Sequence, residues 1–147
     1  MFSLIITIIS IALVAALALA TIYYGGTAFN RGSAEAKASQ LINEGQQING
    51  AVAMARADAA AGTGTSIDLT DTGSSLQELV TAKYLAQAPA SFTLAADGLS
   101  ATAIASSADV CTAVNTKAGL GATVVAADLA NKIYGCITAD KTVTYKF

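Results

Sequence analysis

The first 24 residues, MFSLIITIISIALVAALALATIYY, form an apolar run that limits what the rest of the chain can be. The run contains no Asp, Glu, Lys, Arg, Asn, Gln, Gly or Pro, and the first charged residue of the chain is Arg31. A helix of about 20 apolar residues crosses the hydrocarbon core of a bilayer. Helix is also the state in which a single spanning segment satisfies its own backbone hydrogen bonds. We therefore expect residues 1–24 to form an apolar helix that lies in a membrane or in another dry environment.

The flanks of this run differ from those of a secretory signal peptide. A signal peptide has a basic region followed by about 7–15 apolar residues, whereas this run is longer and has no basic residue before it. An ordinary signal anchor also carries Lys or Arg before its span. These differences favour a mature chain from which a basic leader has been removed, although a short chain that starts at its initiator Met has the same appearance.

Composition weighs against several classes of function. The formal net charge is −2, so the chain has no basic field to attract nucleic acid. It has no His, which removes the commonest general base and a common metal ligand. The apolar start leaves roughly 85 residues for one globular head. We expect no enzymatic activity, no cofactor, no metal site and no nucleic-acid binding.

The two cysteines, Cys111 and Cys136, lie late in the chain. In a reducing compartment they would be free buried thiols, but an exported head favours a disulfide between them. A zinc site is not expected, because no other soft ligand lies nearby.

Residues 25–61 divide into a predicted break and a predicted helix. Gly25 and Gly26 each reduce helix stability by about 1 kcal/mol relative to Ala, so we expect a break, bend or extended stretch within residues 22–32, and we place the break at residues 25–32. Apolar or small residues then recur at helical spacing over residues 33–61, with polar residues between them. This pattern predicts an amphipathic helix that continues into the head.

Residues 62–147 are expected to form a small α+β head. Residues 62–74 predict a polar loop, in which Asp68 and Asp71 lack the spacing of a calcium loop. The elements expected after this loop are a short helix from Ser75 with Glu78 in a capping box, a hairpin around Asp97-Gly98, a helix over 107–120, a helical turn after Ala126, and a hairpin turning at 139–141. The fold class is therefore α+β, with a long N-terminal helix, short helices and an antiparallel sheet.

This layout resembles the type IV pilins. The resemblance rests on FSLIITIISIALVAALALA at the start, on the amphipathic continuation, and on the late cysteine pair followed by CITADKTVTYKF. A start at Met1 and a cysteine ring closing shortly before the last strand are similar to the type IVb branch, which includes the bundle-forming pilins. One departure is clear: most type IV pilins carry Glu at the fifth mature position, where this chain has Ile5.

The resemblance implies a role for each part of the apolar run. Met1 would be the methylated N-terminus, and Gly25 and Gly26 would mark the helix break. The apolar side chains that would pack in a filament core are Phe2, Leu4, Ile5, Ile8, Ile9, Ile11, Leu13, Val14, Leu17 and Leu19.

The function that the resemblance implies is structural. The chain would be the main subunit of a type IV pilus, a helical homopolymer assembled by separate inner-membrane machinery. It would reside in the inner membrane before assembly and in an extracellular surface fibre afterwards. Its exposed head would serve adhesion, motility, DNA transfer or phage attachment. Two alternatives remain open: a pseudopilin or minor pilin of a secretion system, and a membrane-anchored extracytoplasmic binding domain.

Overall fold

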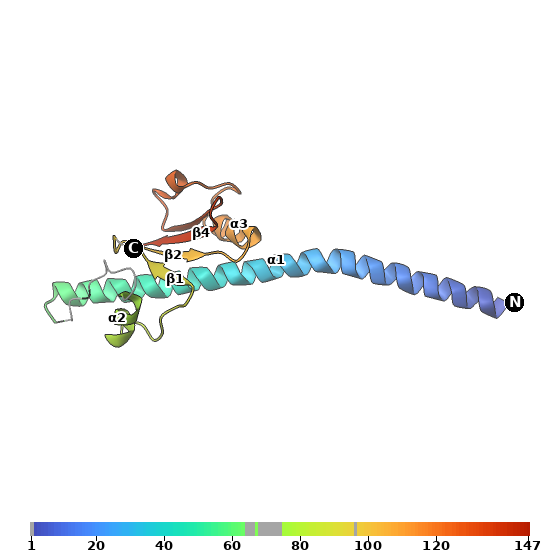
Figure 1. Cartoon of the computed structure of the whole chain (residues 1–147), viewed down its shortest axis with the longest axis horizontal. Helices are drawn as coiled ribbons and strands as arrows, with labels where there is room; N and C mark the ends of the chain where they lie inside the picture. The colour runs from blue at the N-terminus through green and yellow to red at the C-terminus, as the bar shows by residue number, and fades with distance from the viewer. Residues whose placement is uncertain (1, 64–66, 68–74, 96) are drawn as a thin grey trace. The chain divides into compact units, whose positions relative to one another are not determined.

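The computed structural model of the protein describes residues 2–63, 67, 75–95 and 97–147. Its contacts divide the chain into two compact units, Met1–Ser33 and Ala34–Phe147. The described elements are α1 (Phe2–Ala60), α2 (Ser75–Thr81), α3 (Ala108–Lys117), a 3₁₀ turn η1 (Ala126–Leu129) and four strands (Figure 1). The predicted α+β class, with a long N-terminal helix and a small head, is confirmed.

The helix α1 runs through Gly25 and Gly26 without interruption, so the expected break or extended stretch in residues 25–32 is not present in this structure. The expectation counted only the intrinsic cost of glycine, about 1 kcal/mol per residue. Extending an existing helix adds one hydrogen bond for each residue that is fixed, and long helical segments flank both glycines. The propagation of the helix therefore outweighs the local preference of two residues.

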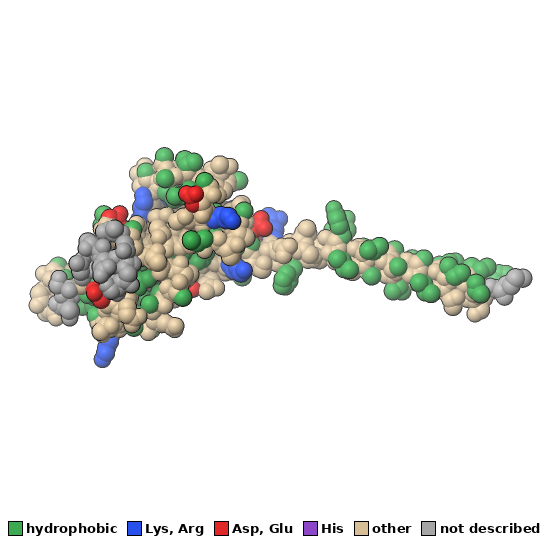
Figure 2. Space-filling model, viewed as in Figure 1, with side chains coloured by type: hydrophobic (Ala, Val, Ile, Leu, Met, Phe, Trp, Pro, Cys, Tyr) green, Lys and Arg blue, Asp and Glu red, His purple; other side chains and the backbone are tan. Residues whose placement is uncertain are grey.

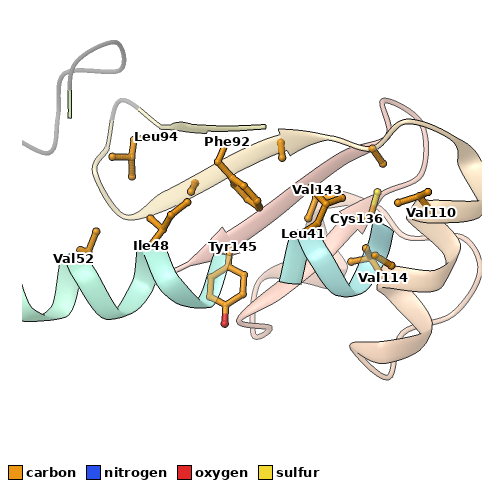
Figure 3. Close-up of a cluster of buried hydrophobic side chains, with 14 of the residues drawn as sticks. Leu41, Ile48, Val52, Phe92, Leu94, Val110, Val114, Cys136, Val143 and Tyr145 are labelled. Atoms are coloured by element: carbon orange, nitrogen blue, oxygen red, sulfur yellow. The ribbon is translucent and has the colours of Figure 1, made fainter. Parts of the chain in front are cut away.

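In the unit Ala34–Phe147, α1 buries one stripe of side chains against the rest of the head. The buried positions recur every three or four residues, as expected for one face of a helix. They are Ala34, Ala38, Leu41, Ile42, Gly45, Ile48, Ala51, Val52 and Ala55. Figure 3 shows members of this stripe packed against strand residues and α3. The predicted amphipathic helix is confirmed, and Gly62, in the left-handed region at φ 69°, follows its end.

A four-stranded antiparallel sheet covers this stripe. Its strands β1 (Phe92–Leu94), β2 (Ser100–Ile104), β3 (Tyr134–Ile137) and β4 (Thr142–Lys146) have the spatial order β1-β2-β4-β3. The first hairpin supplies β1 and β2, the second supplies β3 and β4, and the pairing of β2 with β4 joins them. Alternate residues of β4 are buried, which follows from the two-residue period of a strand.

Both predicted hairpins are present. In the first, Gly98 adopts φ 63° and the Asp97 carboxylate accepts a hydrogen bond from the Leu99 amide at 2.9 Å. The last paired residues are Leu94 and Ala101, so the loop is longer than a two-residue turn. In the second hairpin Lys141 takes the left-handed conformation, at φ 52°.

The predicted short helices are confirmed, with one difference and one open point. Ser107 caps α3 by accepting a hydrogen bond from the Val110 amide at 3.3 Å, and α3 ends at Lys117 rather than at residue 120. The predicted helical turn after Ala126 is present as the 3₁₀ turn η1. The side chain of Ser75, and with it the predicted capping box, lies outside the described residues, as do Asp68 and Asp71.

One close approach between α1 and the sheet requires a glycine. A Cβ atom on Gly45 would lie 2.5 Å from Cδ2 and 2.9 Å from Cγ of Tyr145, whose ring is buried. Gly50 lies on the same helix with nothing within 4 Å of a Cβ at its position. Packing within the chain therefore requires a glycine at position 45 but not at position 50, so the two positions can be compared by the same substitution.

We expect Gly45→Ala to lower the free energy of unfolding by about 1–3 kcal/mol, the usual cost of overpacking a core. Gly50→Ala should leave stability unchanged or raise it by up to about 1 kcal/mol, because alanine is the better helix former and has room here. Urea unfolding of the two variants beside the parent chain measures both changes. Equal effects of the two substitutions would contradict the Gly45–Tyr145 contact.

Candidate functional site: an exposed apolar helix and a clamped head

The N-terminal unit carries an exposed apolar surface. The ten side chains predicted for a filament core, from Phe2 to Leu19, are between 52% and 84% exposed. Figure 2 shows hydrophobic side chains along this segment, which carries no charged ones. The described residues include one helix that is long and apolar enough to cross a membrane by length and composition. Such a surface is unstable in water and requires lipid or protein around it.

Three hydroxyl groups of this segment, those of Thr7, Ser10 and Thr21, donate hydrogen bonds within the helix. Thr7 donates to the carbonyl oxygen of Leu4, and Thr21 donates to that of Ala18, each at 2.8 Å. Ser10 makes the equivalent bond, to Ile6, at 2.8 Å. A hydroxyl that bonds to its own helix can enter a dry environment without leaving an unpaired donor. These bonds make the segment suitable for lipid and equally for a bundle of similar helices.

One face of α1 in the N-terminal unit consists almost entirely of small residues, a feature that the sequence reasoning missed. At 3.6 residues per turn, the positions of this face fall within about 40° of one line along the helix. They are Ser3, Thr7, Ser10, Val14, Ala18, Thr21, Gly25, Ala28 and Gly32, with Val14 as the larger exception. Small residues on one face let two helices approach closely in an apolar environment. The spacing of these residues is visible in the sequence.

Two tyrosines mark the end of the apolar segment. The rings of Tyr23 and Tyr24 pack edge to face with centroids 5.6 Å apart, and both side chains are exposed. Tyr is enriched where an apolar span meets the polar headgroup region of a membrane. The first charged residue, Arg31, lies two helical turns further on. The segment therefore changes from apolar to aromatic to charged along its length.

The structure describes Ile5, the residue at the position where most type IV pilins carry Glu, but it does not describe Met1. Ile5 lies within α1 with 52% of its side chain exposed. No Asp or Glu precedes Glu35 in the chain. Met1, the predicted methylated residue, lies outside the described residues.

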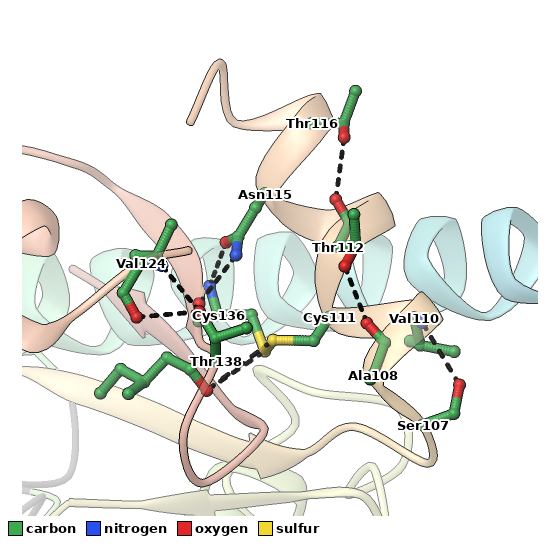
Figure 4. The surroundings of a disulfide bond; sticks show 11 residues. Ser107, Ala108, Val110, Cys111, Thr112, Asn115, Thr116, Val124, Cys136 and Thr138 are labelled. Atoms are coloured by element: carbon green, nitrogen blue, oxygen red, sulfur yellow. Dashed lines mark hydrogen bonds between the residues drawn. A yellow bond between two sulfur atoms is a disulfide. The ribbon is translucent and has the colours of Figure 1, made fainter. Parts of the chain in front are cut away.

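The predicted disulfide is present in the head. Cys111 on α3 and Cys136 on β3 are bonded, with Cα atoms 5.4 Å apart. Both residues are fully buried. Figure 4 shows the bond between α3 and the strand. Disulfides are typical of domains outside the reducing cytoplasm.

A buried asparagine beside the disulfide was not predicted. Asn115 lies four residues after Cys111 on α3 and is fully buried. Its Nδ2 donates to the carbonyl oxygen of Cys136 at 2.9 Å, and its Oδ1 accepts from the amide of Cys136 at 2.7 Å. Asn at this position gives no sequence signal, because asparagine is usually an exposed residue.

Three charged side chains of α1, those of Glu44, Arg56 and Asp58, form hydrogen bonds with other parts of the head. Arg56 donates to the carbonyl oxygen of Gly98 at 2.9 Å, and Glu44 accepts hydrogen bonds from Gln40 and Ser91. Tyr84 donates to Asp58 at 2.7 Å, and this hydrogen bond is the main cause of a raised pKa at Tyr84. These contacts hold α1 to the head and form no catalytic arrangement.

Tyr145 packs in the core beside Tyr134. The two rings are stacked with centroids 5.7 Å apart. Burial, followed by the charge of Tyr134, raises the pKa of Tyr145, while a hydrogen bond with Asn49 lowers it by less. Among the residues that the structure describes, no three potential ligands gather into a metal site.

A comparison with protein-family models, curated proteins and solved structures finds no match to this chain.

We expect loss of the disulfide to lower the free energy of unfolding of the head by about 3–4 kcal/mol, the loop-closure value for this ring. Because the bond is buried, the chain should be reduced in urea and then refolded with and without reductant. The measurement is the urea midpoint by circular dichroism. As the control, a Cys111→Ala/Cys136→Ala double variant should not respond to reductant. An unchanged midpoint for the reduced parent chain would show that the disulfide contributes nothing.

We also expect the head to fold without the apolar segment, because its buried cluster begins at Ala34. A chain that begins at Ala28 should be soluble without detergent and should melt within a few degrees of the full chain in detergent. Precipitation, or a much lower melting temperature, would show that the head depends on residues 2–27. Calorimetry of both chains makes the comparison.

Proposed function

We propose that this chain is the structural subunit of a type IV pilus, polymerising through residues 2–24 of α1. The observation that carries the proposal is the exposed apolar helix attached to a disulfide-bonded head. A helix whose Thr7, Ser10 and Thr21 hydroxyls bond to its own carbonyl groups, and that has one face of small residues, is equally suited to lipid and to a bundle of its own copies. The subunit would be stored in the inner membrane and then moved into the fibre.

The energetics of this transfer explain why the small face matters. Moving an apolar helix from lipid into a protein bundle gains little from the hydrophobic effect, because both environments are dry. Association must then come from close packing, for which Ala18, Gly25 and Gly32 provide room. Extraction from the bilayer requires work, which inner-membrane assembly machinery driven by an ATPase would supply.

Ile5 changes the expected details of assembly. A pilin with Glu at this position is taken to pair it with the N-terminal amine of a neighbouring subunit. Here no carboxylate lies in the apolar run, and a charged amine buried without a partner is costly. In our proposal the amine bonds to hydroxyl or carbonyl oxygens of the neighbouring helix. The acceptor lone pairs of Thr7 and Ser10 remain free to take part, since these hydroxyls act as donors within α1.

We expect surface material sheared from expressing cells to contain uniform fibres built from this chain, visible by negative-stain electron microscopy with antibody labelling of the head. A protein found only in the detergent-extracted membrane would overturn the proposal and favour a membrane-anchored binding domain. Short fibres confined to the cell envelope would favour a pseudopilin.

A pair of variants separates packing from membrane anchoring. Ala18→Leu fills the small face but keeps the segment apolar, so the amount of chain in the membrane should be unchanged while fibres are lost or reduced more than about tenfold. Leu17→Ile keeps the volume and should assemble like the parent chain. Normal fibres from Ala18→Leu would contradict the proposed role of this face.

A further inference from the structure

Two separate connections join α3 to the same residue of β3. Cys111 forms the disulfide with Cys136, and Asn115, one turn later on the helix, bonds to both backbone polar groups of Cys136. Figure 4 shows the amide and the disulfide side by side on this strand. One connection is covalent and depends on oxidation, whereas the other is a pair of hydrogen bonds that contains no redox-active group.

The strand register explains why the backbone of Cys136 is available to Asn115. Along a strand of an antiparallel pair, the backbone amide and carbonyl groups of every second residue bond to the partner strand. Those of the residues between them point away from the partner strand. The Lys146 amide donates to the carbonyl oxygen of Ile133 at 2.7 Å, so Ile133 is a residue whose backbone bonds to the chain of β4. Cys136, which pairs with Val143, lies three residues further on and therefore has backbone groups that point away from β4. Its amide and carbonyl groups therefore face the outer edge of β3, where the Asn115 amide meets them.

We propose that Asn115 is a positioning residue for the Cys111–Cys136 disulfide. Its two hydrogen bonds hold Cys136 against α3 in the reduced chain, so the two thiols are near bonding distance before oxidation. The two thiols are then already oriented for disulfide formation, and reacting groups that are held in this way have a high effective concentration. The inference concerns the folding of the head and does not depend on the function proposed above.

The oxidation is an ordinary thiol–disulfide exchange with an external disulfide oxidant such as oxidised glutathione. One cysteine thiolate attacks the oxidant and forms a mixed disulfide, releasing one thiolate. The second cysteine thiolate attacks the sulfur of the first and expels the other half of the oxidant. Two thiol protons and two electrons leave the chain, and the oxidant disulfide is reduced to two thiols.

Burial makes the positioning effective. Asn115, Cys111 and Cys136 are all fully buried, so water does not compete for the two hydrogen bonds. If the Asn115 side chain is removed, the amide and carbonyl of Cys136 lose these partners in a dry site. The edge of β3 would then be held to α3 less tightly in the reduced chain. Formation of the disulfide would have to bring the strand back into position, which makes the bond less favourable.

The test measures the equilibrium between the thiols and the disulfide in the full chain in detergent micelles. Glutathione buffers set the redox potential, and alkylation followed by mass spectrometry gives the oxidised fraction, and hence the effective concentration of the two thiols. Asn115→Ala should lower this effective concentration by about tenfold, because two hydrogen bonds are lost. A tenfold change corresponds to about 1.4 kcal/mol.

Two further variants separate positioning from general stability. Asn115→Leu fills the same space with no donor or acceptor and should give a similar fall; it also tests the proposal if Asn115→Ala does not fold when reduced. Val52→Ala removes buried volume at the other end of the cluster shown in Figure 3 and should leave the effective concentration within about twofold of the parent. Asn115 variants that match the parent, or an equal fall in Val52→Ala, would overturn the proposal.

Discussion

The structure depends on the ability of one helix to satisfy its own backbone wherever it lies. Every interior amide of α1 bonds within the helix, so its environment is decided by side chains alone. From Phe2 to Phe29 those side chains are apolar, aromatic or small and exposed; from Ala34 onward one stripe is buried under the sheet. The same secondary structure can therefore serve lipid, a filament core and a protein core along a single segment.

Local features of the head were predictable because each carries its own chemical signal. Asp97-Gly98 indicates a turn, Ser107 indicates a helix start, and the alternation of Val143 and Tyr145 with polar residues indicates a half-buried strand. Each of these elements is present. The pairing of the cysteines followed from an exported head with two cysteines, and it too is present. The turn, the helix start and the strand each depend on residues that are near one another in the sequence. The disulfide joins the only two cysteines of the chain.

The features that were missed depend on residues far apart in the chain. The pairing of β2 with β4, the contact of Gly45 with Tyr145 and the bonds of Asn115 to Cys136 have no signature in a local window. The break expected at Gly25 and Gly26 failed for a related reason, since helix propagation is a property of the whole segment. For the candidate site, the apolar residues could be read from the sequence, whereas in the proposed filament the surroundings of the N-terminal amine would depend on a neighbouring chain.

The outer edge of β3 connects the stability of the head with its proposed assembly. An open strand edge offers unpaired backbone groups to other chains and promotes irregular association. At Cys136 those groups are taken by Asn115, and at Thr138 the amide donates to the carbonyl oxygen of Val124 at 3.0 Å. In a filament, heads would be held at high local concentration for long periods. Closing this edge with a side-chain amide and a returning loop would make pairing between heads unfavourable there, and in the proposed filament it would leave ordered contact between subunits to the apolar helix.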